Sequence, residues 1–202
     1  MNVPGATPRS CSICSSRALP DPLLVVVTGM PAAGKTTLAR ALSEALGLPL
    51  VTKDDIKEEL YDALGTGDVE WSQRLGKASY ALIFVFCRAL LARGRSMIAE
   101  ANFFAGTDEE RFTELPPHRL VQVHCTAPLE VLLARWESRR DRHPGHLDRE
   151  RAVELRQRFN ESVHRPLALP GELIEVDTSE AVDVEWIAQA AMASSASSSS
   201  AP

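Results

Sequence analysis

Two glycines five positions apart, followed at once by a lysine and two threonines, carry the clearest chemistry in this chain. The segment reads G-M-P-A-A-G-K-T-T from residue 29 to residue 37 and matches the spacing G-x-x-x-x-G-K-[ST]. Glycine lets backbone N–H groups wrap closely around an anion, and a helix that starts there points its positive end at the same place. Lys35 adds a charge for the outer phosphates, and Thr36 adds a hydroxyl that can ligate Mg²⁺.

The pattern predicts a P-loop that binds a nucleoside triphosphate with Mg²⁺, the alternative being an ordinary glycine-rich turn between a strand and a helix. An apolar run at residues 23–27 precedes it, as the motif requires. The residues predicted to bind the nucleotide here are Gly29, Met30, Pro31, Ala32, Ala33, Gly34, Lys35, Thr36 and Thr37.

Acidic and amide side chains follow two further expected strands. Asp54 and Asp55 come after the strand expected at 50–52, where a carboxylate can accept the proton of an attacking hydroxyl or, alternatively, cap the next helix. Glu100 and Asn102 follow the strand expected at 96–100 and can contact an acceptor or a metal-bound water, the alternative being a turn that ends the strand. These groups are predicted to gather at the carboxyl edge of a parallel sheet.

Eight of the eighteen arginines lie between residues 135 and 158. Arg135 and Arg139 are four apart, and we expect them on one face of a helix at 128–140, where one can stack on a base and the other can meet phosphates. The loop from Arg139 to His146 contains Pro and Gly and is predicted to close as a lid that excludes water; a solvated charged surface is the alternative. His143 and His146 are expected to shape this loop rather than bind metal.

The elements that must position these groups alternate along the chain. We expect strands near 23–28, 50–52, 96–100, 119–125 and 173–177, and helices near 35–46, 54–64, 69–93, 107–115, 128–140, 148–160 and 182–192. This alternation predicts an α/β fold with three layers, in which helices cover both faces of a parallel sheet. One domain is expected over residues 22–192, between tails at 1–21 and 193–202 that are too poor in apolar residues to fold.

The composition of the chain limits the classes of partner that it is expected to bind. The net charge of −5 argues against broad adhesion to nucleic acid or to an anionic membrane, and no apolar run is long enough to span a bilayer. Cys11 and Cys14 form a lone C-x-x-C that is a weak zinc signal, while Cys87 and Cys125 lie in apolar segments and are expected in the core. A reducing cytoplasm is the expected setting.

Taken together, the motifs resemble the small P-loop kinases. The matching segments are G-M-P-A-A-G-K-T-T, K-D-D-x-x-K, A-E-A-N, P-L-E-V-L-L-A-R-W-E-S-R and E-V-D-T-S, and the resemblance covers about residues 22–190. The most similar patterns are those of polynucleotide 5′-hydroxyl kinases, zeta-toxin-type kinases, chloramphenicol phosphotransferases and proteins of the AAA ATPase family. The resemblance implies ATP as phosphoryl donor, an alcohol acceptor and a five-stranded sheet in the order 2-3-1-4-5.

The resemblance also assigns roles to residues. It places Asp54 at the general-base position and Lys57 where the group often has an Arg that contacts the acceptor. It matches Arg135 to an adenine-stacking position, Arg139 to a phosphate-contacting position and Arg142 to a lid arginine. Lys35, Asp54, Arg139 and Arg142 are thus the predicted catalytic residues, and Asp54, Lys57, Glu100 and Asn102 the predicted acceptor-binding residues.

Three functions remain open on these grounds. A kinase of a small molecule leads, because Lys57 lacks the planar fork with which Arg grips an acceptor phosphate, and because the chain has no room for the additional domain common in polynucleotide kinases. A nucleic-acid 5′-hydroxyl kinase is the second. A regulatory or mechanical NTPase is the third, although no strand ends in the apolar-run-then-Asp pattern typical of a motor.

Overall fold

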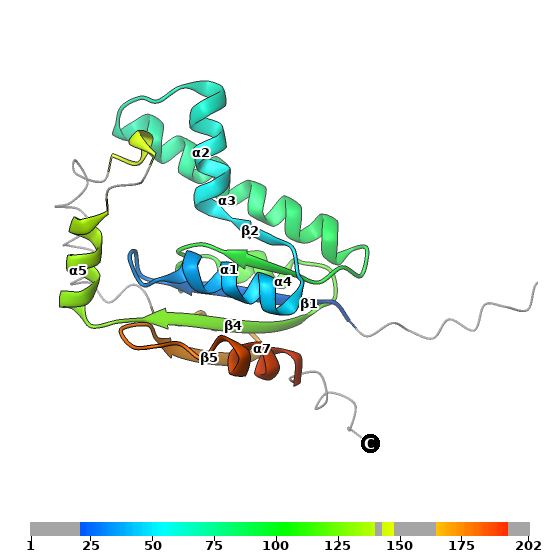
Figure 1. Ribbon diagram of the computed structural model, residues 1–202. Helices are drawn as coiled ribbons and strands as arrows, with labels where there is room; N and C mark the ends of the chain where they lie inside the picture. Colours follow the sequence, from blue (N-terminus) through cyan, green and yellow to red (C-terminus); the bar gives the residue numbers. More distant parts are fainter. Residues whose placement is uncertain (1–20, 140–142, 148–164, 194–202) are drawn as a thin grey trace, which may run out of the picture.

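The apolar segment Leu23–Gly29 forms strand β1 at the centre of a five-stranded parallel sheet in this computed structural model, which describes residues 21–139, 143–147 and 165–193 (Figure 1). The strand order is β2-β3-β1-β4-β5, and every neighbouring pair is parallel. The other strands are β2 (Leu50–Thr52), β3 (Met97–Glu100), β4 (Arg119–Thr126) and β5 (Glu172–Asp177). The predicted α/β fold and the predicted sheet order are both confirmed.

Alternate residues of β1 face the two layers of helices. Leu23, Val25 and Val27 pack in one core cluster with α1 (Lys35–Leu46) and α7 (Val184–Ala193). Leu24 and Val26 point the other way, into a cluster with α3 (Val69–Leu91) and α4 (Glu109–Thr113). Because both faces of β1 are covered, all seven of its residues are buried, which explains its unbroken apolar run.

The helices differ from the predicted ranges mainly at their ends. Helix α3 ends at Leu91 rather than near 93, α4 is only five residues long, and α5 (Leu129–Ser138) ends before residue 140. A short 3-10 turn, η1 (Pro144–His146), stands within the predicted irregular loop. The helix predicted at 148–160 and nearly all of the two predicted tails lie outside the described residues.

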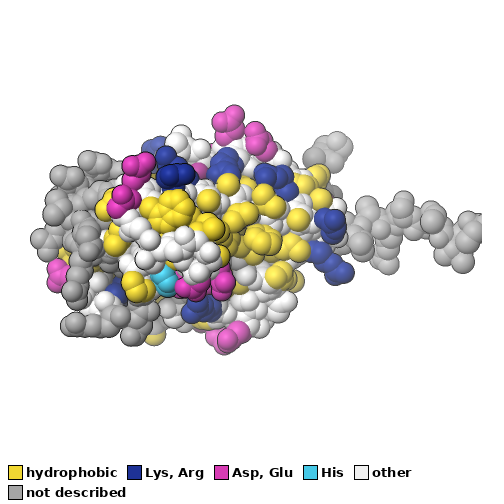
Figure 2. Space-filling model, turned by 90° about the horizontal axis from the view of Figure 1, so that it is seen from above, with side chains coloured by type: hydrophobic (Ala, Val, Ile, Leu, Met, Phe, Trp, Pro, Cys, Tyr) yellow, Lys and Arg dark blue, Asp and Glu magenta, His cyan; other side chains and the backbone are white. Residues whose placement is uncertain are grey.

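Helices α2 (Lys53–Leu64) and α3 pack against each other and rise beyond the sheet (Figure 1). Each starts with a side-chain cap: Thr52 accepts a hydrogen bond from the Asp55 N–H, and Asp68 accepts one from the Trp71 N–H. Hydrophobic side chains gather on this side of the molecule (Figure 2), and Phe86 of α3 is 44% exposed.

The two cysteines of the described chain are core residues, as predicted. Cys87 lies on the buried face of α3, and Cys125 lies near the end of β4. Burial raises the pKa of each thiol to about 12, so both stay protonated at neutral pH. Among the described helices, none combines the length and the apolar character needed to cross a bilayer.

Candidate active site

The turn between β1 and α1 has the backbone geometry of an anion cradle. Gly29 has a φ of +135°, and a Cβ there would overlap the carbonyl oxygen of Cys125 on the neighbouring strand, so only glycine fits. Gly34 has a φ of +73° and occupies the cap position of α1, and Ala32 also has a positive φ, of +65°. Residues at positive φ turn successive N–H groups toward one point, and the N-terminus of α1 faces the same place.

The Lys35 ammonium lies inside this turn. Lys35 is 6% exposed, and its Nζ donates a hydrogen bond to the Met30 carbonyl oxygen at 2.7 Å. Burial lowers the pKa of Lys35, and the negative potential of Glu100 opposes that shift. The positive charge is therefore fixed beside the cradle, where the outer phosphates of a nucleotide would lie.

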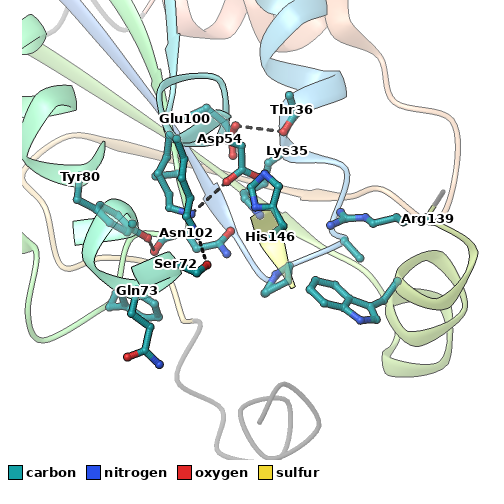
Figure 3. A pocket seen from close by; sticks show the side chains of 18 of the residues that line it. Lys35, Thr36, Asp54, Ser72, Gln73, Tyr80, Glu100, Asn102, Arg139 and His146 are labelled. Carbon is teal, nitrogen blue, oxygen red and sulfur yellow. Dashed lines mark hydrogen bonds and ion pairs between the residues drawn. The ribbon is translucent and has the colours of Figure 1, made fainter. Parts of the chain in front are cut away.

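Thr36 and Glu100 meet at the same edge of the sheet (Figure 3). The Thr36 hydroxyl donates to Glu100 Oε2 at 3.1 Å. Glu100 is the last residue of β3, 4% exposed, and burial raises the pKa of its carboxyl, with the Lys35 charge opposing. A hydroxyl and a carboxylate oxygen suit Mg²⁺, because a P-loop Ser or Thr and an acid at the end of a strand are the ligand types that hold it in P-loop proteins.

This arrangement changes one expectation from the sequence. The absence of an apolar run ending in Asp counted against an NTPase, yet Met97–Glu100 is an apolar strand whose last residue supplies the carboxylate as Glu. The sequence left three interpretations of Glu100 open: contact with an acceptor, contact with a metal-bound water, or a turn that ends the strand. The Glu100 side chain is bonded to the P-loop threonine and does not cap a turn among the described contacts.

The two candidate carboxylates on α2 point to different places. Asp54 lines the cavity beside the P-loop, where its Oδ1 accepts from Lys53 Nζ at 3.1 Å (Figure 3). Asp55 is bonded to Arg40 at 3.2 Å on the surface, with 56% of its side chain exposed. Neither aspartate caps α2, because Thr52 does. Asp54 alone of the pair is thus placed to meet an acceptor in the cavity.

A cavity of about 430 Å³ runs from the P-loop to the space between α2 and α3. Lys57 lines this second part, is 2% exposed, and donates to Ser72 Oγ at 2.9 Å. The Tyr61 hydroxyl lies 2.6 Å from the same Ser72 oxygen, and the Lys57 ammonium stands 5.2 Å from the Tyr61 ring centroid. The second part of the cavity therefore has an ordered, polar floor.

Asn102 lines the cavity from a loop that is anchored by aromatic rings. Phe103 is 1% exposed and packs edge-to-face on Phe84 and Phe112, with centroids 6.1 and 5.1 Å away. The Tyr80 hydroxyl donates to the Asn102 carbonyl oxygen. Packing below the loop thus holds the Asn102 backbone in place.

Arg135 and Arg139 have different surroundings in the structure. The helix ends at Ser138, so Arg139 has an extended backbone, and the prediction that it shares a helix face with Arg135 is wrong. Arg139 lines the cavity and stands 5.3 Å from the Trp136 ring centroid. Arg135 binds Thr178 after β5 and does not line the cavity. Arg142 lies outside the described residues.

His143 and His146 join η1 to helix α2, which fits their predicted role in shaping the loop. His143 stacks on the Tyr61 ring at 5.1 Å and lies 3.2 Å from Asp62. His146 lies 2.8 Å from Glu58 and lines the cavity. We call the segment from His143 to His146 the histidine turn. No group of three or more metal-ligating side chains occurs within the described ranges.

Most of the predicted site residues therefore meet in one cavity. Those that line it are Pro31, Ala32, Gly34, Lys35, Thr36, Asp54, Lys57, Glu100, Asn102 and Arg139. Gly29, Met30 and Ala33 shape the P-loop from outside the cavity wall, and Thr37 is exposed on α1.

Sequence reasoning did not identify which residues of α3 line the cavity. Ser72, Gly76 and Tyr80 line the cavity at intervals of four, which is one face of a helix. Tyr80 is the aromatic residue of α3 that lines the cavity. A serine and a glycine inside an apolar helical stripe were the available signal, since both are poor core residues for a helix.

Comparison with known proteins places this site in a family. The family described as "AAA domain" matches residues 24–162. A solved structure from Chloroflexus aurantiacus J-10-fl, provisionally described as a kinase, is 38% identical with a TM-score of 0.80, covering 86% of this chain and 98% of its own. A search among curated proteins found no match.

Two more distant structures share the fold. They are a sugar kinase from Janibacter sp. HTCC2649 and a gluconokinase from Sinorhizobium meliloti 1021, each 19% identical, with TM-scores of 0.55 and 0.53. The matches cover 86% and 87% of this chain and 94% and 92% of those chains. The resemblance to P-loop kinases is confirmed, and the chain belongs to the AAA domain family within that P-loop kinase group.

Proposed function

We propose that this protein is a kinase that transfers the γ-phosphoryl group of ATP to a hydroxyl of a small molecule. One observation carries the proposal: Asp54 and the P-loop residues Lys35 and Thr36 line the same cavity, which continues past them between α2 and α3. A site that only hydrolysed ATP would need no such room beyond the phosphates. The cavity volume of about 430 Å³ suits a small acceptor beside the phosphate tail.

On this proposal the P-loop and Lys35 hold the β- and γ-phosphates, and Arg139 faces them from the end of α5. Thr36 and Glu100 would hold Mg²⁺, and the ion would neutralise phosphate charge when bound. Lys35 and Glu100 already influence each other electrostatically in the structure, so the cation and the acid share one small volume.

Asp54 serves as the general base. As the acceptor oxygen forms its bond to the γ-phosphorus, the bond from that phosphorus to the bridging oxygen breaks, and ADP leaves. The proton of the acceptor hydroxyl passes to the Asp54 carboxylate. Asp54 sits on the first turn of α2, at the edge of the cavity, with 36% of its side chain exposed, so an acceptor can reach it.

The experiment measures transfer from γ-labelled ATP with Mg²⁺ to a panel of hydroxyl compounds and oligonucleotides, with Lys35→Ala as the blank. We expect Asp54→Asn to lower kcat by about a hundredfold or more, the ordinary contribution of a general base. Asp55→Asn is the matched control, since it removes the neighbouring carboxylate from the surface, and it should stay near wild type. Equal activity in the two variants would refute the base assignment.

The panel also separates the other functions. Transfer to oligonucleotides alone would establish a nucleic-acid 5′-hydroxyl kinase, for which the net charge of −5 is unfavourable. Hydrolysis without any transfer, unchanged by Asp54→Asn, would establish a regulatory NTPase instead.

A further inference from the structure

Charge is unevenly divided along the cavity. Among the described lining residues the acids are Asp54 and Glu100, and both act on the Lys35 charge at the P-loop end. The other end, between α2 and α3, is lined by Lys57 and Lys77. The phosphate end also carries Lys53, which pairs with Asp54, and Arg139, so acids and cations mix there, while the acceptor end is lined by two ammonium groups.

Lys57 is fixed in the floor of that acceptor end. It is 2% exposed, and its ammonium is held by Ser72 Oγ at 2.9 Å and stands over the face of Tyr61. The Ser72 oxygen lies 2.6 Å from the Tyr61 hydroxyl, and Figure 3 draws Ser72 among the side chains that line the cavity. A buried ammonium whose position is set in this way has little conformational freedom left to lose when a ligand binds. It therefore suits recognition of an anion.

Gly76 opens the wall next to this ammonium. It lies in the middle of the 23-residue helix α3, where glycine costs about 1 kcal/mol relative to alanine. It lines the cavity, and a Cβ built on it would stand 3.9 Å from both Cε and Nζ of Lys57. A side chain at this position would therefore contact Lys57 and occupy part of the cavity beside its ammonium. A role in ligand binding explains why glycine stands here.

Lys77 adds a second cation next to Gly76. It is exposed and lines the cavity, so it stands at the mouth where Lys57 stands at the floor. We call Lys57, Ser72, Gly76 and Lys77 the α2–α3 subsite.

We propose that the acceptor carries an acidic group, a carboxylate or a phosphate, and that this group binds at the α2–α3 subsite while the reacting hydroxyl lies at Asp54. The inference rests on the proposed kinase function, because it assigns the acceptor class of that same site. Lysine binds an anion as a point charge rather than through a planar fork, so either acidic group satisfies it.

The spacing along α2 limits the size of the acceptor. Asp54 and Lys57 are three residues apart on one helix, so their Cβ atoms lie about 5–6 Å from each other. Both side chains line one cavity of about 430 Å³, so the acidic group and the reacting hydroxyl belong to one small acceptor. Small hydroxy acids and short sugar phosphates meet this condition, whereas a long chain between the two groups does not.

The test measures binding without turnover. Saturating Mg²⁺-ADP fills the P-loop, and calorimetry then follows titration with glycerol and its two acidic relatives, D-glycerate and glycerol 3-phosphate, and with inorganic phosphate. We expect the acids to bind about tenfold or more tightly than glycerol, the usual scale for a hydrogen bond to a charged group. The two acids separate a carboxylate preference from a phosphate preference.

Variants then locate the binding. Lys57→Met and Lys77→Met should each weaken acid binding about tenfold, and Gly76→Ala should weaken it without any change of charge. Arg88→Met is the matched control, because it removes a cation from an exposed position of the same helix outside the cavity. If Lys57→Met fails to fold, as judged by circular dichroism, Gly76→Ala and Lys77→Met still decide.

The proposal is overturned if glycerol binds as tightly as the acids, if no acid or phosphate binds at millimolar concentration, or if the α2–α3 variants match Arg88→Met. Its failure is distinct from failure of the kinase function. Phosphoryl transfer to neutral alcohols alone would refute the proposal of an acidic acceptor and would still support the kinase function. Binding of the acids that depends on Lys57 and Lys77, with no phosphoryl transfer from ATP, would support the α2–α3 subsite and refute the kinase function.

Discussion

The Arg135 guanidinium donates two hydrogen bonds to Thr178, one to its hydroxyl at 3.0 Å and one to its carbonyl oxygen at 2.6 Å. The same hydroxyl lies 3.1 Å from the carbonyl oxygens of Ala33 in the P-loop and of Thr126 at the end of β4. A hydroxyl has one proton, so it accepts from Arg135 and donates to one of the two carbonyls at a time. Thr178 thus joins the P-loop to α5.

Loss of this junction should loosen the nucleotide site. We predict that Thr178→Val, which keeps the shape but removes the hydroxyl, weakens Mg²⁺-ADP binding about fivefold, the scale of one hydrogen bond. Thr178→Ser keeps the hydroxyl and should bind like wild type. Calorimetry measures both, and a valine variant with unchanged affinity would show that the P-loop holds its shape without Thr178.

The fit of Gly29 against β4 should appear in stability. Gly29→Ala would place a methyl group on the Cys125 carbonyl at a φ of +135°, so we predict a loss of about 3 kcal/mol or more in the free energy of unfolding. Gly47→Ala is the matched control, because Gly47 also has a positive φ, of +62°, but has open space around its Cβ position. This substitution should cost about 1 kcal/mol, the penalty of a Cβ in the left-handed conformation. Urea unfolding compares the two, and equal losses would contradict the steric argument.

Metal binding should depend on pH through Glu100. Burial raises the pKa of this carboxyl above its ordinary value of 4.5, and a proton on it competes with the metal. The affinity for Mg²⁺-ADP should therefore fall as the pH falls, and the decline should begin above the range of an exposed glutamate. Glu100→Gln should bind more weakly at neutral pH and lose this dependence.

The pH experiment has an internal control. Titration with ADP in EDTA removes the metal and should show little of the decline that Glu100 causes. A wild-type profile that is flat from pH 8 to the ordinary glutamate range, or one that Glu100→Gln reproduces, would exclude Glu100 as a contact of the metal or its waters.

The histidine turn should be sensitive to a single methyl group. A Cβ on Gly145 would come within 2.7–2.8 Å of three atoms of the Tyr61 ring, and that ring is 2% exposed and cannot move aside freely. We predict that Gly145→Ala displaces the turn and raises hydrogen–deuterium exchange at residues 143–147 several-fold. In a Tyr61→Leu background the same substitution should have a smaller effect. Equal effects in both backgrounds would show that the ring does not hold the turn.

The parts of the fold that were predicted correctly depend on local rules. The apolar run before Gly29 and the P-loop spacing are contiguous in the chain, so the strand, the turn and the helix were readable. The carboxyl-edge rule for parallel sheets brought Asp54, Glu100 and Asn102 to the P-loop cavity. The sheet order came from the resemblance, because strand order is a tertiary property that these local patterns do not encode.

The parts that were missed depend on contacts across the chain. Asp54 and Asp55 are adjacent in sequence, and only the resemblance chose between them; the packing of α2 shows that Asp54 faces the cavity and Asp55 faces Arg40. The sequence around Gly76 gives no sign of its role, because the role depends on the packing of α2, which places Lys57 opposite this glycine. The end of α5 at Ser138 separates Arg139 from Arg135, and helix ends are the least reliable part of a pattern.

The hydrogen bond from Lys35 to the Met30 carbonyl has a thermodynamic consequence for nucleotide capture. Folding alone has already stripped water from this ammonium and frozen its rotatable bonds. An incoming triphosphate exchanges one oxygen partner for another and does not recruit a hydrated side chain from bulk solvent. Folding therefore immobilises the Lys35 ammonium before the nucleotide arrives. Binding of the nucleotide does not add the entropic cost of ordering that side chain.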